Sequence, residues 1–447
     1  MSEEATLDEF VSTEHLEEKK ETPIGKIPSD WNVEWLNDVV RINPDGFSQD
    51  GWPSEKFEYI SLSEASNGDI EGSKTTPLEE APSRAQRTVQ HGDVLVGTVR
   101  PKQKSHGFVS AEHDGKICSS GFGVLRTGAN LNSRYLNQEI LSNRFFCQME
   151  AYVAGSGYPA VKISDLKKHR VSVPPLSEQR KIATVLYAVD RTIQKNQQIY
   201  EKAREVEEAS KTKFFTRGYS RWELDESVGW RCRANKFPKD WKVKPAEELM
   251  NITRGASPRP RSDDSLFGGE IPWIKIGDAE RGISKSIKDV DSYVTEKGKQ
   301  KSKFVKKGTL LVANSGATCG FSVFAGVDGC VHDGWLILRE HDGLVSDFLY
   351  HYINWNYNYL QSLSLGSAQT NLSTGLFGRL DIPLPPIQEQ RQIVEALDSI
   401  NQVATHASKE VERLKRLKRG LMQDLLSGTV RTTDTNIEIP EEIAKHG

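Results

Sequence analysis

Apolar residues recur every three or four positions along two long stretches, one near the middle of the chain and one near its end. In the first stretch the a and d positions of a heptad fall on Ile182, Leu186, Val189, Ile193, Asn196, Tyr200, Ala203, Glu207, Ser210 and Phe214. Adding 211 gives those of the second stretch, Ile393, Leu397, Ile400, Ala404, Ala407, Val411, Leu414, Lys418, Leu421 and Leu425. A heptad sustained over this length predicts a long helix with a helical partner.

Both predicted helices have clear start and stop signals. A Pro-Pro pair precedes each one, at 174–175 and 385–386, and proline marks a sharp junction before a helix. Ser177 is a plausible N-cap, with Glu178 well placed against the helix dipole. Gly218 and Gly428 are the stop signals. Each helix then has about 40 residues and a length of about 60 Å at ~1.5 Å per residue.

The same repeat continues outside the helices. Matched segments that read as chain starts, strands and Gly-Ser loops lie at 27–31 and 237–241, 92–96 and 308–312, 123–126 and 335–339, and 155–156 and 366–367. Short strands, turns and a few helices are indicated between each Trp start and each Pro-Pro pair. Each half therefore predicts an α+β globular domain of ordinary size.

The predicted fold class is α+β with a pseudo-two-fold internal repeat, in which two globular domains are joined by two long antiparallel coiled-coil helices. An antiparallel pair would hold one domain at each end. The predicted segments are an acidic flexible tail (1–22), domain 1 (23–175), helix 1 (176–218), a linker (219–237), domain 2 (238–386), helix 2 (387–428) and a C-terminal tail (429–447).

Composition narrows the class of protein. Charged residues make up 27% and hydrophobic ones 36% of the 447 residues, and no apolar run is long enough to span a membrane. Residues 1–22 do not resemble a secretion signal. The five cysteines lack Cys-x-x-Cys spacing, which argues against a disulfide framework or a zinc site and predicts a cytoplasmic protein.

The net charge of −3 is unevenly distributed. The tails 1–22 and 434–447 are acidic, whereas 281–307 holds nine bases against three acids and 84–104 holds five against one. Local positive fields of this kind attract a polyanion. Solvated basic loops are the alternative explanation. Two similar domains at a fixed separation suit double-stranded DNA, which presents the same face about every 34 Å.

The two helix starts carry a family resemblance. Pro-Pro-Leu-Ser-Glu-Gln-Arg-Lys-Ile at 174–182 and Pro-Pro-Ile-Gln-Glu-Gln-Arg-Gln-Ile at 385–393 resemble the conserved-region signature of type I restriction-modification specificity subunits. The preceding segments, the Trp31 and Trp241 starts and the Gly-Ser loops also fit. The resemblance covers about residues 23–430.

This resemblance implies that the globular domains are target-recognition domains, each reading half of a bipartite, asymmetric DNA site. The implied partners are double-stranded DNA, two methyltransferase (modification) subunits and restriction/translocase subunits, with no membrane. S-adenosylmethionine, ATP and Mg are then expected on the partner subunits, and no cofactor, metal or catalytic residue on this chain. The absence of a phosphate-loop motif and of an Asn-Pro-Pro-Tyr motif agrees with that expectation.

Base recognition requires Arg, Lys, Asn and Gln side chains, which match the major-groove edges of guanine and adenine. The candidates in the first domain are Arg84, Arg87, Arg100, Lys102, Gln103, Lys104, Ser156, Tyr158 and Lys162. Those in the second domain are Arg254, Arg259, Arg261, Lys275, Asn314, Ser315, Thr318, Gln369 and Asn371. For each of them a solvated surface position is the alternative, and 314–316 could be a simple turn.

The helix starts supply candidates for partner docking, namely Glu178, Gln179, Arg180, Glu389, Gln390 and Arg391. A role in capping the helices is the alternative. His332, His351 and His406 show no ligand spacing and are treated as ordinary. Two other functions remain open, an enzyme with its own degenerate nuclease or transferase site and a coiled-coil adaptor without DNA contact.

Overall fold

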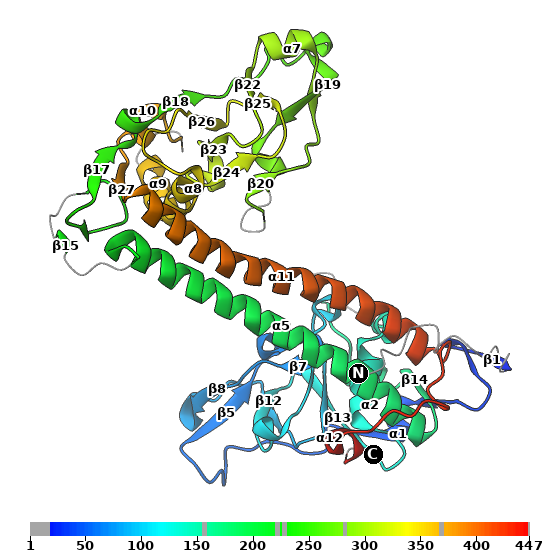
Figure 1. Ribbon diagram of the computed structural model, residues 1–447. Helices are drawn as coiled ribbons and strands as arrows, with labels where there is room; N and C mark the ends of the chain where they lie inside the picture. Colours follow the sequence, from blue (N-terminus) through cyan, green and yellow to red (C-terminus); the bar gives the residue numbers. More distant parts are fainter. Residues whose placement is uncertain are drawn as a thin grey trace, which may run out of the picture. The chain divides into compact units, whose positions relative to one another are not determined.

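The structure is a computed structural model, which describes residues 18–153, 159–219, 224–225, 230–279, 284–365 and 371–445. The chain divides into two compact units, 1–195 with 411–447 (the first unit) and 196–410 (the second unit). Each unit combines one globular domain with a part of both long helices (Figure 1).

Two four-stranded sheets form the centre of the first unit. One has the order β11-β10-β13-β4 and is antiparallel, with β4 (Val40–Ile42), β10 (Val94–Gly97), β11 (His106–Phe108) and β13 (Phe122–Thr127). The other has the order β8-β5-β12-β9, with β5 (Lys56–Ile60), β8 (Lys74–Pro77), β9 (Ala85–Thr88) and β12 (Ile117–Ser119), and its β5–β12 pair is parallel. Successive residues of β10 enter different hydrophobic clusters, Val94 and Val96 one and Leu95 another, so both faces of this strand are covered.

The second unit repeats this plan. Its first sheet has the order β18-β26-β23-β24-β20, with β18 (Asn251–Arg254), β20 (Ser286–Ile287), β23 (Leu310–Ala313), β24 (Ser322–Ala325) and β26 (Trp335–Arg339). Its second sheet has the order β21-β19-β25-β22, with β19 (Phe267–Ile274), β21 (Tyr293–Val294), β22 (Lys303–Val305) and β25 (Gly329–Val331). The pair β19–β25 is parallel, like β5–β12. Leu310 and Leu311 of β23 likewise enter different clusters.

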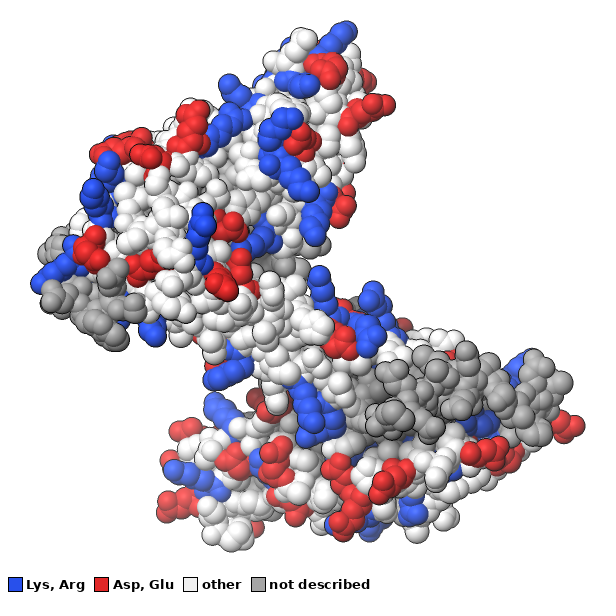
Figure 2. All heavy atoms as spheres, viewed as in Figure 1, with Lys and Arg blue, Asp and Glu red and all other residues white. Residues whose placement is uncertain are grey.

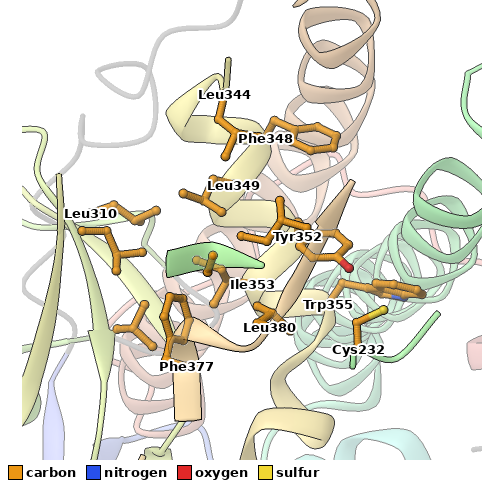
Figure 3. Close-up of a cluster of buried hydrophobic side chains, with 14 of the residues drawn as sticks. Cys232, Leu310, Leu344, Phe348, Leu349, Tyr352, Ile353, Trp355, Phe377 and Leu380 are labelled. Atoms are coloured by element: carbon orange, nitrogen blue, oxygen red, sulfur yellow. The ribbon is translucent and has the colours of Figure 1, made fainter. Parts of the chain in front are cut away.

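Short paired helices cover one side of each domain, α2 (Ser133–Leu141) with α3 (Asn143–Ala151), and α8 (Ser346–Trp355) with α9 (Tyr357–Leu365). Figure 3 shows Phe348, Tyr352 and Trp355 of α8 gathered with Leu310 of β23 and with Phe377 in one apolar cluster. The remaining helices are α1 (Leu36–Val39), α4 (Ile163–Leu166), α6 (Ala246–Leu249), α7 (Glu296–Gln300), α10 (Thr374–Gly378) and α12 (Glu441–Ala444). The remaining strand pairs are β1 (Lys19–Thr22) with β2 (Gly25–Pro28), β3 (Asn32–Trp35) with β14 (Arg170–Val173), β6 (Ala65–Ser66) with β7 (Asp69–Ile70), β15 (Leu224–Asp225) with β16 (Phe237–Pro238), and β17 (Lys242–Pro245) with β27 (Asp381–Leu384).

The two predicted long helices are α5 (Leu176–Arg217) and α11 (Ile387–Leu426). In the first unit, Ile193 near the start of α5 packs against Val411 and Leu414 in the later part of α11. In the second unit, Phe215 near the end of α5 shares a core with Ile393 and Leu397 near the start of α11. The helices therefore pack antiparallel, and the predicted fold class is confirmed.

Details of the helix pattern differ from the prediction. Because α5 begins at Leu176, Ser177 lies inside the first turn and is not the N-cap. Phe215, not Phe214, is fully buried, and Tyr200 is 36% exposed at a predicted seam position. The charged seam positions are matched by ion pairs. Glu207 contacts Lys211 at 2.6 Å, and the Lys418 ammonium lies 2.6 Å from the Asp190 carboxylate across the helix pair.

The buried histidine of β11 makes the stability of the first unit depend on pH. His106 is 3% exposed, its Nδ1 accepts the Gly97 N–H at 3.2 Å, and burial lowers its pKa to about 4. An unfolded histidine takes up a proton near pH 6.5, whereas the folded one does so only near pH 4. Protons therefore favour the unfolded chain between these values, and we expect the free energy of unfolding to fall by about 3 kcal/mol from pH 6.5 to 4. Urea titrations over this range measure the slope.

His106→Gln should flatten this dependence, whereas replacing the exposed His91 by glutamine should preserve it. Equal slopes for wild type and His106→Gln would assign the effect to other groups.

Candidate nucleic-acid interface

The turn between β25 and β26 gathers several of the predicted DNA-binding residues of the second domain. The Arg254 Nε donates to the Asp333 carbonyl oxygen at 2.7 Å, and an Arg259 guanidinium nitrogen lies 3.3 Å from the Asp333 carboxylate. Arg261 approaches the His332 ring to 3.5 Å. All three arginines are exposed, so the turn holds them together at the surface.

Asp333 itself is held firmly in this turn. Its Oδ1 accepts the Ser257 hydroxyl at 2.7 Å and lies 3.1 Å from Nε2 of His332. Partial burial acts to raise the pKa of Asp333, but the Ser257 hydrogen bond and the charges of Arg254 and Arg259 lower it below the ordinary value. Burial lowers the pKa of His332. At neutral pH the turn therefore presents a carboxylate among arginines.

Lys275 and Asn314 lie beside the same turn but use their polar groups internally. The Lys275 ammonium donates to Ser292 Oγ at 2.5 Å and lies 4.6 Å from the centre of the Trp273 ring, which packs against His332. Asn314 is 2% exposed and donates through Nδ2 to the Asp333 carbonyl oxygen at 3.1 Å. Asn314 therefore supports the turn, and its predicted contact with a base stays untested.

The other second-domain candidates lie nearby in the chain. Ser315 forms an isolated β-bridge with Asn371, and both are partly exposed, as is Thr318 at the end of a short 3₁₀ turn. The bridge ties the segment after the Gly-Ser loop to the end of β23. Gln369 lies outside the described residues.

In the first domain the basic candidates surround another tight turn. Arg100 and Lys104 bracket a 3₁₀ turn and have the positive φ angles 49° and 48°. Arg100, Lys102 and Gln103 are exposed, and Lys102 contacts Glu150 at 3.4 Å. The Arg100 N–H donates to the Pro159 carbonyl oxygen at 2.8 Å. Arg100 and Gln103 border a hollow of about 450 Å³ that Leu62, Ser63 and Ser66 also line.

Arg87 does not belong to this surface. Its guanidinium turns inward and donates to the carbonyl oxygens of Ser120, at 2.8 Å, and of Phe122. Burial lowers its pKa. These bonds hold the turn after β12, and the base contact by Arg87 stays an untested prediction. Arg84 and Lys162 are exposed, whereas Ser156 and Tyr158 lie outside the described residues.

The Glu-Gln pairs at the helix starts are buried inside their own units. Gln179 accepts the Asn132 N–H at 2.8 Å, and Gln390 accepts the Val345 N–H at the same distance. Glu178 accepts the Trp31 indole N–H at 2.9 Å, and its counterpart Glu389 accepts that of Trp241 at 3.3 Å.

These four side chains are buried and fasten each helix start to its domain. Arg180 is partly exposed and Arg391 is exposed. The docking prediction stays untested for all six residues.

Figure 2 shows one face of the molecule, on which Lys and Arg side chains of the second unit are interspersed with Asp and Glu side chains. Within the described ranges, no helix is long and apolar enough to cross a membrane, and no group of three His, Cys, Asp or Glu side chains is arranged for a metal ion.

The arrangement of two similar domains, each followed by a long helix, has a match among known families. The family model described as type I restriction modification DNA specificity domain matches residues 28–205 and again residues 238–418. The chain belongs to this family. The type I specificity family supplies DNA selection, so the predicted role of a DNA specificity subunit, with no catalysis of its own, is confirmed at this level.

Individual members of the type I specificity family resemble the chain over most of its length. The putative type I restriction enzyme MjaX specificity subunit of Methanocaldococcus jannaschii is 25% identical over 430 residues, which cover 92% of this chain and 96% of that protein. The HindI specificity subunit of Haemophilus influenzae is 21% identical, with 90% of this chain and all of the relative covered.

Solved structures share the fold. The type I restriction-modification S subunit from M. genitalium matches with a TM-score of 0.57 at 15% identity, covering 90% of this chain and 98% of that one. A second match is a chain from a structure that describes complex assembly of the type I restriction-modification system. Its TM-score is 0.53 at 24% identity, and the match covers 90% of this chain and 99% of that one.

Sequence reasoning missed two residues of this interface, His332 and Asp333. The sequence signal that could have found them is a His-Asp-Gly turn directly after a strand that matches β12 of the first domain. This turn becomes a candidate site only because the fold brings arginines to it, and these arginines lie more than 70 positions earlier in the chain.

Proposed function

We propose that this chain reads a divided, asymmetric DNA sequence, with one half-site for each recognition domain. The supporting observation is that the two domains share one strand and turn framework but carry different side chains on it. In the second domain Arg254, Arg259 and Arg261 surround an acid, whereas the first domain presents Arg100, Lys102 and Gln103. Different side chains on one framework read different bases.

The exposed basic side chains serve two purposes. Contacts to phosphate fix the position of a domain on the duplex, and contacts to base edges specify the sequence. Arg100, Lys102 and Lys104 lie on a strained turn that contains no acidic residue, so they suit contacts with phosphate. Arg254, Arg259 and Arg261 suit guanine, and Asn371 suits adenine.

Membership of the family supports a proposal for the partners. Two modification subunits would methylate adenine N6 with S-adenosylmethionine, and restriction subunits would use ATP and Mg²⁺. We propose the exposed surface at the two helix starts, with Arg180 and Arg391, as their docking region. The complex would act on chromosomal and incoming DNA, which would place it in the cytoplasm.

Modified-base sequencing of host DNA, with and without the gene for this chain, tests the proposal. The modification partner must be present in both strains. We expect N6-methyladenine in one split motif only when the gene is present. An unchanged pattern of methylation would contradict the proposal and favour an adaptor without DNA contact.

Arg100→Ala should weaken binding of the complete methyltransferase complex to DNA by a similar factor for every sequence. If Arg100 contacts one phosphate, the slope of log affinity against log salt should become less steep by about 0.9. Fluorescence titrations at several salt concentrations measure both quantities. The exposed Lys56 provides a control of the same charge in the same domain. An unchanged salt slope would remove Arg100 from the DNA surface.

A further inference from the structure

The two domains build the same turn at the same place. In the second domain His332, Asp333 and Gly334 join β25 to β26, and the Gly334 N–H donates to His332 Nδ1 at 2.9 Å. In the first domain the corresponding turn joins β12 to β13, and the Gly121 N–H donates to Ser119 Oγ at 3.1 Å.

Both turns are also fixed to a neighbouring strand by the same backbone bond. Asn314 donates its N–H to the Gly334 carbonyl oxygen, and Thr98 donates its N–H to that of Gly121, each at 2.8 Å. The backbone frame is therefore shared.

The middle residue of the turn differs between the domains. The first domain has Ser120, whose carbonyl oxygen accepts from Arg87. The second has Asp333, whose carbonyl oxygen accepts from Arg254 and Asn314. In both domains the backbone alone therefore supplies an acceptor for an arginine. The carboxylate of Asp333 is an addition to a frame that the first domain builds without it.

A carboxylate opposes binding of the DNA backbone, so its presence among three exposed arginines calls for a chemical reason. The Asp333 side chain is 25% exposed, and its orientation is fixed by Ser257 and His332. An ionised carboxylate only accepts hydrogen bonds. In the major groove the groups that donate are the amino groups of cytosine and adenine.

Cytosine is the better match of the two. The adenine amino group lies beside N7, which is an acceptor and would repel a carboxylate, whereas cytosine presents its N4 amino group without an adjacent acceptor on the same base. The guanine paired with it offers O6 and N7, which arginine recognises. Arg254 and Arg259, both in contact with Asp333, are placed for that guanine.

We propose that Asp333 is a specificity-determining residue, which accepts a hydrogen bond from the N4 amino group of cytosine in the half-site of the second domain. This inference rests on the proposed function. It predicts a C·G pair at one position of that half-site, read by an acid on one base and by arginine on the other.

The proposal is tested by sequencing modified bases in a host that carries the partner subunits and each variant of the chain. Asp333→Ser installs the residue of the first domain, and we expect one position of the second half-site to become degenerate while the first half-site is unchanged. Asp333→Asn adds a donor and should admit adenine there, since a carboxamide matches its N6 and N7. The expected loss of discrimination is about 5- to 150-fold, the range of one good base contact.

Asp289→Asn serves as the matched control, because it removes an exposed carboxylate elsewhere in the same domain. This variant should retain the wild-type motif. If a variant of Asp333 gives no methylation, the purified complex is titrated with four duplexes that differ only at this position. Unequal loss of affinity among them supports the proposal.

Equal loss on all four duplexes, or a wild-type motif without C·G at the affected position, would overturn it. The proposed function fails separately, if the wild-type chain itself gives no split motif.

Discussion

Glu178→Ala is expected to lower the free energy of unfolding of the first unit by about 2–4 kcal/mol, because it leaves the buried Trp31 indole N–H without this acceptor and leaves Arg431 with Asp30 in place of a bidentate pair. Arg431 reaches the Glu178 carboxylate with Nε at 2.8 Å and with a terminal nitrogen at 3.0 Å, and its side chain is 13% exposed. The carboxylate also accepts the indole N–H of the fully buried Trp31. Urea unfolding followed by tryptophan fluorescence measures the loss.

Two further variants separate the contributions. Glu178→Gln keeps an acceptor for the Trp31 indole and should therefore cost less than Glu178→Ala. At the second helix start, Glu389 accepts from Trp241 at 3.3 Å and from the Tyr219 N–H at 3.0 Å, and Glu389→Ala should lower the free energy of unfolding of the second unit by about 1–3 kcal/mol. Equal costs for Glu178→Gln and Glu178→Ala would show that the Trp31 hydrogen bond adds nothing.

Ile443→Ala should lower the free energy of unfolding of the first unit by about 2–5 kcal/mol, the usual cost of emptying a packed isoleucine site. Ile443 is fully buried in the main cluster of that unit, although it lies in the C-terminal segment. Its carbonyl oxygen accepts Nδ2 of Asn132, the N-cap of α2, at 2.8 Å. The segment thus completes both the core and the cap.

Val430→Ala is the matched control, because Val430 lies in the same segment and is 49% exposed. We expect a change within about 0.5 kcal/mol for it. The midpoint of urea unfolding reports both variants. Similar small shifts would mean that the C-terminal segment contributes little to the folded unit.

The sequence predicts the long helices and the repeat because periodic apolar positions and paired prolines are local signals. Ile182, Leu186, Ile393 and Leu397 are fully buried, as the heptad requires. The pattern does not reveal that Phe215 replaces Phe214 in the core, since a domain and not only a helix covers that end of α5. The sequence predicts an acidic C-terminal tail, because its charge does not reveal that Ile443 is buried in the core of the first unit with Ile439 packed against the same cluster.

The candidate site is predictable only in part. Arg259 and Arg261 lie in a Gly/Pro/Ser loop, and their exposure follows from that composition, whereas Arg254 ends β18 just before this loop. Arg87 lies in an equally basic stretch but turns inward, because carbonyl acceptors more than 30 residues away meet it in the fold. Glu178 and Gln179 are polar residues at a helix start, and only the tertiary structure shows that they bind Trp31 and Asn132.

The most direct test of the account exchanges residues 238–385 for the corresponding domain of another type I specificity subunit and sequences the modified bases of the host. The proposal that each domain reads its own half-site predicts that one half of the split motif changes to that of the donor and that the other half is retained. A motif that changes in both halves, or in neither while methylation continues, would contradict the assignment of one half-site to each domain.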